Sequence, residues 1–258
     1  MSIRPKALTA EAFTCARTSP AGASSSPSRS PPGGEKFPVG LWDGATENKT
    51  VVTAMLADLV SRGLSAGDGL LVVMDGAEAL STAVNEVFGG FVAVQRCTLH
   101  KRRNVGDHLP DRGKAWVDAK LVKAFNHPDP ELGLRNTKHL ASPLDKTHPG
   151  AASSLREGLE KMFAVSRLGI DGRLAKTLVT SNPVKSMISI ARTTNRNVTR
   201  WRDGHMVLRP ATAGMLNAER SFRKIKGSQQ MPQLVAAQHR HARPDTTTQT
   251  YEPVGTAA

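Results

Sequence analysis

Three features of this 258-residue sequence predict an α/β fold with a parallel sheet and a long helical insertion. Two Val-rich runs, LLVVM at 70–74 and FVAVQ at 91–95, are typical of strands, and the first has the wholly apolar composition of a strand covered on both faces. Helical patterns at 46–63 and 79–88 alternate with these strands at the lengths of a parallel layout. From 101 to 181 the pattern is helical, without convincing strands.

The composition predicts a cytoplasmic protein with an acidic partner. Hydrophobic residues make up 39% of the chain, which is enough for a core, and 35 Lys and Arg against 22 Asp and Glu give a net charge of +13. Such an excess indicates nucleic acid before a membrane surface. We expect no membrane partner, because no run approaches the roughly 20 apolar residues of a spanning helix. With only Cys15 and Cys97 present, no disulfide framework is expected.

The first part of the chain divides into a leader and the start of the sheet. Residues 1–34 are predicted to be a disordered leader, because 18–34 are almost entirely Ser, Pro, Gly and Ala. Residues 35–100 are predicted to hold the first part of the core, beginning with a short strand, FPVGLW, at 37–42. The helix at 46–63 has an apolar stripe, and Gly63 is a plausible left-handed cap at its end.

The rest of the chain is predicted to be mainly helical. The insertion at 101–181 contains helical patterns at 111–125, 150–163 and 171–179, separated by Pro and Gly. Residues 182–226 are predicted to form basic helices that return to the core, at 183–192 and 203–226. Residues 227–258 are polar and are predicted to be a frayed tail.

Asp75 directly follows the first apolar strand. Functional side chains collect beyond the carboxyl ends of parallel strands, because the loops there share one edge of the sheet. Gly76 behind it permits a tight exit into the next helix. Two interpretations of Asp75 remain open, a catalytic or metal-binding carboxylate and a simple N-terminal helix cap.

Cys97 and His100, in QRCTLHKRRN, have the spacing of half a zinc site. A structural zinc needs four ligands, and the sequence has no second cysteine pair to supply them. The alternative is that Cys97 packs as a small hydrophobic residue while His100 forms an ordinary hydrogen bond.

Basic residues form two groups that suit a DNA backbone. The first group continues from His100 and consists of Lys101, Arg102 and Arg103. The second lies in residues 185–226, where ten Lys and Arg face two Asp and Glu, and its DNA-binding candidates are Arg192, Arg196, Arg200 and Arg202, with Trp201 packing beside them. The alternative for both groups is a solvated surface. Binding of this kind depends on phosphates and weakens strongly with salt.

Five segments resemble, in order and spacing, the catalytic half of the Mutator-type bacterial insertion-sequence transposases. They are GLWDGATENKT, VVMDGAEAL, QRCTLHKRRNVGDHLP, THPGAASSLREGLE and TSNPVKSMISIARTTNRNVTRW. The similarity extends over about residues 35–230, and Cys97 and His100 match a C-x-x-H signature of that group.

The resemblance implies a ribonuclease-H-like sheet interrupted by an all-helical insertion. It also implies an Asp, Asp, Glu triad that binds two divalent ions, normally Mg²⁺, and catalyses DNA strand cleavage and joining. Two such ions, about 3.5 to 4 Å apart, activate the attacking oxygen and stabilise the leaving oxygen of a displacement at phosphorus. Asp75 matches the second acid of the triad, which makes it the expected catalytic residue and metal ligand.

The sequence departs from the family pattern at the other two acids. No Asp precedes Asp43, which lies within the matched GLWDG segment rather than on the earlier strand, and nothing around Glu11 matches. Lys185 occupies the place of the third acid. A unit-charge pair 4 Å apart is worth about 4 kcal/mol at an effective dielectric of 20, so an ammonium competes with bound cations. We therefore expect a partial sheet and poor metal occupancy.

Two functions follow from these observations. The first is a transposase that cleaves and joins DNA with Asp75 as one metal ligand. The second is a non-enzymatic remnant that binds DNA, or that forms a homo-oligomer or pairs with an intact transposase. The unmatched acids favour the second function for this chain.

Overall fold

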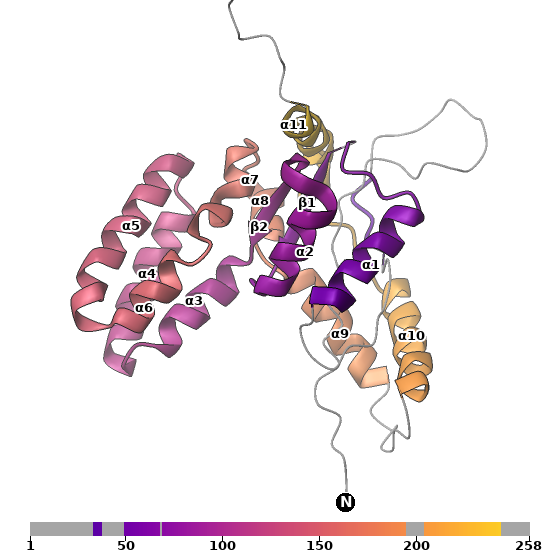
Figure 1. Ribbon diagram of the computed structural model, residues 1–258, viewed down its shortest axis with the longest axis horizontal. Coiled ribbons are helices and arrows are strands. Elements are labelled where there is room, and N and C mark those ends of the chain that lie inside the picture. Colours follow the sequence, from indigo (N-terminus) through magenta and orange to yellow (C-terminus); the bar gives the residue numbers. More distant parts are fainter. Residues whose placement is uncertain (1–32, 38–48, 68, 195–203, 244–258) are drawn as a thin grey trace, which may run out of the picture.

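The computed structural model describes residues 33–37, 49–67, 69–194 and 204–243. These residues form a small parallel sheet with helices on both faces, a helical body inserted after the second strand, and a pair of helices beside the sheet (Figure 1). None of the described helices has both the length and the apolar character needed to cross a bilayer. The strand expected at 37–42 falls outside the described residues except for Phe37, which is not in a strand.

The sheet forms as the alternation of strands and helices predicts. Its elements are α1 (Lys49–Ser61), β1 (Leu70–Met74), α2 (Glu78–Phe88), η1 (Gly89–Phe91) and β2 (Val92–Arg96). The two strands run parallel, with Met74 opposite Arg96 at their carboxyl ends. Gly63 follows α1 with a φ of 90°, which confirms the predicted left-handed residue.

The chain between β2 and residue 181 is helical, as predicted. It forms α3 (Thr98–Asp107), α4 (Asp111–Phe125), α5 (Pro130–Thr147), α6 (Pro149–Arg156), η2 (Leu159–Phe163), α7 (Ala164–Arg167) and α8 (Gly172–Leu178). Helices α3 to α6 have a core of their own, in which Leu121 and Leu155 are fully buried and Phe125 meets Phe163 edge-on.

The helix predicted over 150–163 breaks at Gly158. This residue has a φ of 60°, and a Cβ atom placed on it would lie only 2.3 Å from Nη1 of Arg96. The left-handed conformation of Gly158 interrupts the helix, and the side chain of Arg96, from the end of β2, lies so close that a larger residue would not fit there.

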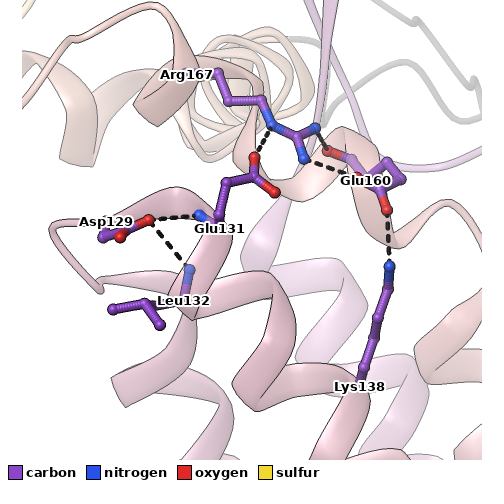
Figure 2. A network of polar contacts seen from close by, with 6 residues as sticks. All are labelled: Asp129, Glu131, Leu132, Lys138, Glu160 and Arg167. Atoms are coloured by element: carbon purple, nitrogen blue, oxygen red, sulfur yellow. Dashed lines mark hydrogen bonds and ion pairs between the residues drawn. The ribbon is translucent and has the colours of Figure 1, made fainter.

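Charged side chains fasten the start of α5 to the last part of the insertion (Figure 2). Asp129 caps α5, because its Oδ1 accepts a hydrogen bond from the Glu131 N–H at 2.8 Å. Arg167 donates to Glu131 Oε1 at 2.9 Å and to Glu160 Oε2 at 2.7 Å, and Lys138 donates to Glu160 at 3.1 Å. Each exposed pair contributes at most about 1 kcal/mol, but together they connect three elements of the insertion.

Two helices follow the insertion, in the part of the chain where helices were predicted. α9 (Asn182–Thr194) and α10 (Gly204–Arg220) pack against each other through Met187, Met215 and Ala218. The helix predicted over 203–226 ends at Arg220, and Ile225 then turns into the core beneath the sheet.

The frayed tail predicted from residue 227 is wrong for residues 231–242. They form α11 (Met231–Ala242), which follows η3 (Ser228–Gln230). Met231 and Leu234 are buried with Leu71 of β1, so α11 covers one face of the sheet. Its apolar side is short and includes the buried Gln238, which is why the sequence pattern reads as polar.

Alternate residues of the two strands face two different cores. Leu70, Val72 and Met74 pack against α1 and α2, whereas Leu71 and Val73 pack against residues of α7, α8 and α11. Every residue of both strands is buried. This explains why β1 is apolar throughout instead of alternating.

Candidate functional site

The candidate site lies at the carboxyl edge of the sheet. Asp75 follows β1 and Cys97 follows β2, at equivalent positions in the parallel register. The two chain exits are joined by a hydrogen bond of 2.7 Å from the Cys97 N–H to the Met74 carbonyl oxygen. The parallel pairing therefore brings Asp75 and Cys97 to the same edge of the sheet.

Asp75 is half-buried and does not cap a helix. Its Oδ1 accepts a long hydrogen bond, 3.4 Å, from the Ala77 N–H, but α2 begins at Glu78 with Ala77 at the cap position and no side-chain cap. Gly76 has a φ of 119°, and a Cβ atom there would lie 2.2 Å from Nη2 of Arg96. The tight exit predicted for Gly76 therefore also makes room for an arginine.

Cys97 and His100 hold the residue that precedes α9. The Ser181 N–H donates to Cys97 Sγ at 3.3 Å, and Ser181 Oγ lies 3.2 Å from His100 Nδ1. The neighbouring Thr98 N–H and hydroxyl both donate to the Val179 carbonyl oxygen, at 2.9 and 3.1 Å. The C-x-x-H motif thus connects the end of β2 to the start of the returning helix, across more than 80 residues of sequence.

The described residues offer no zinc site at this motif. Cys97 is buried and acts as a hydrogen-bond acceptor, and no group of three His, Cys, Asp or Glu side chains in the described ranges could hold a metal ion. The non-metal interpretation of Cys97 and His100 accounts for the contacts that the structure contains.

Lys185 belongs to the same site, from the first turn of α9. Its backbone N–H donates to the Ser181 carbonyl oxygen at 3.1 Å. The pKa of His100 is lowered, first by burial and then by the positive charge of Lys185, while the negative charge of Asp75 opposes the shift. Asp75, His100 and Lys185 therefore lie within electrostatic reach of one another.

These side chains do not fit a pair of Mg²⁺ ions. Mg²⁺ requires oxygen ligands, chiefly carboxylates, and the edge offers the carboxylate of Asp75 beside an imidazole, a thiol and an ammonium. Asp43, which lies in the matched GLWDG segment, falls outside the described residues.

Lys101, expected to contact DNA, is buried instead. Its side chain is only 1% exposed, and Nζ donates to the carbonyl oxygens of Ser154 and Glu157 at 2.5 and 2.6 Å. Burial, followed by the positive charge of Arg96, lowers the pKa of Lys101 to about 8. The expectation of a DNA-facing Lys101 is wrong, because its charge is used inside the protein.

Arg96, Lys101 and Glu157 form what we call the Arg96 cluster. Arg96 donates to the Glu157 carbonyl oxygen at 2.7 Å and to the Gly76 carbonyl oxygen at 3.2 Å, and its Nη1 lies 3.1 Å from Glu157 Oε1. The cluster joins the sheet, the end of α6 and the loop that carries Asp75. Sequence reasoning missed it, although an arginine at the end of a buried strand is the signal that could have revealed it.

The other expected DNA contacts are divided among different environments. Arg102 forms a bidentate pair with Asp118 of α4, at 2.6 and 2.5 Å, whereas Arg103 and Arg192 are exposed. Consecutive residues of a helix point about 100° apart, so the basic run after His100 cannot form one surface. Arg196, Arg200, Arg202 and Trp201 lie outside the described residues.

A model of a known protein family matches most of the chain. The family model described as "Transposase, Mutator family" matches residues 31–223, about three quarters of the chain, and includes the whole carboxyl edge described above. None of the curated proteins shows significant similarity to the chain.

Proposed function

Because this chain belongs to the Mutator family of transposases, we propose that it is a DNA-binding protein on a transposase scaffold whose strand-transfer centre is impaired. The reaction of such transposases is metal-dependent cleavage and joining of DNA strands during transposition. The expected compartment is the cytoplasm, where bacterial DNA lies.

The observation that carries this proposal is the cation at the third-acid position. The Cys97 and His100 contacts to Ser181 bring the start of α9 to the carboxyl edge, where the family pattern expects an acid. Lys185 supplies a positive charge there instead, close enough to lower the pKa of His100. A positive charge that acts on the same imidazole as Asp75 favours an anion at this edge over a second divalent cation. We therefore assign no step of metal-dependent strand transfer to these residues.

A ribonuclease-H-like arrangement of the sheet is part of the proposal. Its support is the parallel pair β1 and β2, the helical insertion that follows β2, and the return of α9 to the edge that carries Asp75.

DNA binding by the pair α9 and α10 is the second part of the proposal. Arg192, Arg209, Arg220 and Arg223 are exposed on these helices and the turn after them, and none of the four is in an ion pair within the described ranges. Such a surface binds phosphates without reading bases, so affinity should fall steeply with salt.

The catalytic part is tested with duplexes that carry the inverted repeats flanking the gene, incubated with Mg²⁺. We expect no cleavage or joining by the wild-type chain and none by Lys185→Glu, whose donor set still lacks paired acids. Cleavage by the wild type that disappears in Asp75→Ala would overturn the proposal and favour an active transposase.

The binding part is tested by measuring duplex affinity against salt concentration. The triple variant Arg192→Gln, Arg220→Gln, Arg223→Gln should lower the magnitude of the log–log slope by up to about 3, close to one unit per lost phosphate contact. The matched control Arg135→Gln, Lys146→Gln, Lys176→Gln removes the same charge from other exposed positions and should change the slope much less. Equal effects of the two triples would exclude α9 and α10 as the DNA site.

A further inference from the structure

We propose that the exposed side of α4 binds an unpaired nucleotide of a DNA strand, with Trp116 as the stacking surface and Arg112, Lys120 and Lys123 as phosphate contacts. This inference rests on the proposed DNA-binding function. It adds to that function a second surface, in the insertion, and a different state of the substrate, a strand whose bases are not paired.

Trp116 is exposed on a helix whose opposite side is fully occupied. Val117, Leu121 and Phe125 face the core of the insertion and are buried, whereas Trp116 keeps 56% of its surface exposed. More than half of the indole surface therefore remains in contact with water after folding, and a partner could cover it.

Cations flank the indole on the same side of the helix. Arg112, Trp116, Lys120 and Lys123 follow one another at spacings of four, four and three residues, which places them on one helical face. The ammonium of Lys120 lies 5.7 Å from the centre of the Trp116 ring. Within the described ranges, none of these three cations is in an ion pair.

The acids of α4 do not neutralise this face. Asp111 pairs with Lys114 at 2.9 Å, and Asp118 forms the bidentate pair with Arg102 of α3. Both carboxylates are thus engaged by cations other than the three that flank Trp116. The face therefore keeps three uncompensated positive charges around one exposed indole.

The surroundings of Trp116 favour nucleic acid over a protein partner. The neighbouring exposed residues on this side are Ala115 and Ala119, which add little apolar area. A protein interface would bury a larger apolar patch, and the other large exposed apolar residues of the described ranges belong to other elements. Aromatic rings interleaved with cations are typical of surfaces that stack bases and contact the adjoining phosphates.

The unpaired state of the base follows from geometry. In an intact duplex both faces of every base are covered by stacking, so an indole standing above a helix surface has access only to phosphates and groove edges. A single strand or a frayed end exposes its base faces, and stacking on an aromatic side chain does not depend on which base is present.

The test uses the full chain with an oligothymidine of about 12 nucleotides, which spans the usual footprint of such surfaces, and with a duplex of the same length. Trp116→Ala should weaken oligothymidine binding by about tenfold, the effect of losing one stacked base, and leave duplex binding within about twofold. Binding should also quench tryptophan fluorescence in the wild type more than in Trp116→Phe, since the remaining Trp42 and Trp201 are common to both.

The cations are tested with Arg112→Gln, Lys120→Gln, Lys123→Gln against the control Arg135→Gln, Lys146→Gln, Lys176→Gln. The first triple should reduce the salt slope of oligothymidine binding by about 2, as expected for three phosphate contacts on a single strand, and the control should not. An unchanged oligothymidine affinity in Trp116→Ala would overturn the inference. So would a change in oligomeric state on substitution of Trp116, because the face would then serve a second copy of the chain.

The two proposals can fail separately. Duplex binding that persists while Trp116→Ala has no effect on oligothymidine would leave the proposed function standing and remove only this inference. If the wild type does not bind duplex DNA but binds oligothymidine in a way that depends on Trp116, the inference stands and duplex binding by α9 and α10 is excluded.

Discussion

Two adjacent residues, Arg96 and Cys97, lead from the end of β2 into two regions that differ in how their charges are paired. Arg96 enters the Arg96 cluster, where two buried cations meet the carboxylate and carbonyl oxygen of Glu157. Cys97 leads to the carboxyl edge, where Lys185, His100 and Asp75 influence one another without an ion pair among them in the described structure. The charged groups of the Arg96 cluster are paired, although Arg96 Nε has no hydrogen-bond partner in the described structure. At the carboxyl edge, Lys185 is exposed and is in no ion pair within the described ranges.

The two regions differ in how strongly folding constrains their charges. An unpaired charge inside the protein costs several kcal/mol, so the Arg96 cluster must be satisfied for the chain to fold. A reversed charge at the exposed edge costs little stability, because water screens it. Folding can therefore tolerate the exposed charge of Lys185 at this edge.

The largest effect is expected from Arg96→Ala. The substitution removes the hydrogen bonds to Glu157 and Gly76 and empties the space that Gly158 leaves for the side chain, which should cost about 3 to 5 kcal/mol of unfolding free energy. Urea denaturation followed by circular dichroism measures it. Arg102→Ala is the control, because its partly exposed pair with Asp118 should cost at most about 1 kcal/mol. Equal costs would mean that the cluster is no more important than a surface pair.

A pH dependence should distinguish Lys101 from surface lysines. The pKa of Lys101 is about 8 in the folded protein and 10.5 in the unfolded chain. Between these two pH values the unfolded chain binds more protons than the folded protein. The free energy of unfolding therefore rises with pH over this range. The rise is about 2 to 3 kcal/mol, since one pKa unit corresponds to about 1.4 kcal/mol. Lys101→Met should remove it, as seen in the difference between wild-type and variant unfolding free energies at pH 8 and pH 10. An identical difference at both values would contradict the burial of the charged ammonium.

At the carboxyl edge, the contact to Ser181 should have a smaller effect. Ser181→Ala removes the hydroxyl that meets His100 but keeps the backbone bond to Cys97, and it should cost about 1 kcal/mol, the usual value of one hydrogen bond. Ser221→Ala serves as a control, because the Ser221 hydroxyl bonds only to a carbonyl oxygen of its own turn. Thermal denaturation of the two variants is the measurement, and a larger loss in the control would exclude the contact as a structural connection.

The smallest effect is a change in the titration of His100. Lys185→Glu replaces a cation with an acid, so the pKa of His100 should move upward toward its ordinary value, as measured by NMR titration of the imidazole. The wild-type pKa lies below the unfolded value, so this histidine destabilises the fold as pH falls through about 6.5, and the variant should show less of that loss. Lys176→Glu, on the exposed side of α8, should leave the titration unchanged. No shift in Lys185→Glu would mean that Lys185 is not part of the site.

Sequence patterns predicted the elements that local periodicity controls. β1 and the helix at 111–125 were predicted at the bounds that the structure shows, and Asp75 and Cys97 were predicted at the strand ends where they lie. The patterns failed where a distant residue decides the local structure. Gly158, after α6, is left-handed and packs against Arg96 from the end of β2, and the short apolar side of α11 packs against the sheet.

The amino-acid sequence by itself determined the α/β order and the family, because each depends on residue type and spacing along the chain. Only the tertiary structure decided which cations are available. Lys101 and Arg102 both belong to the basic run after His100, but neither charge is free for a ligand. Lys101 is buried against two carbonyl oxygens, and Arg102 is paired with Asp118. Net charge is a sum over residues, but the charge that a ligand meets depends on which side chains the fold has already satisfied, and that depends on partners far away in the sequence.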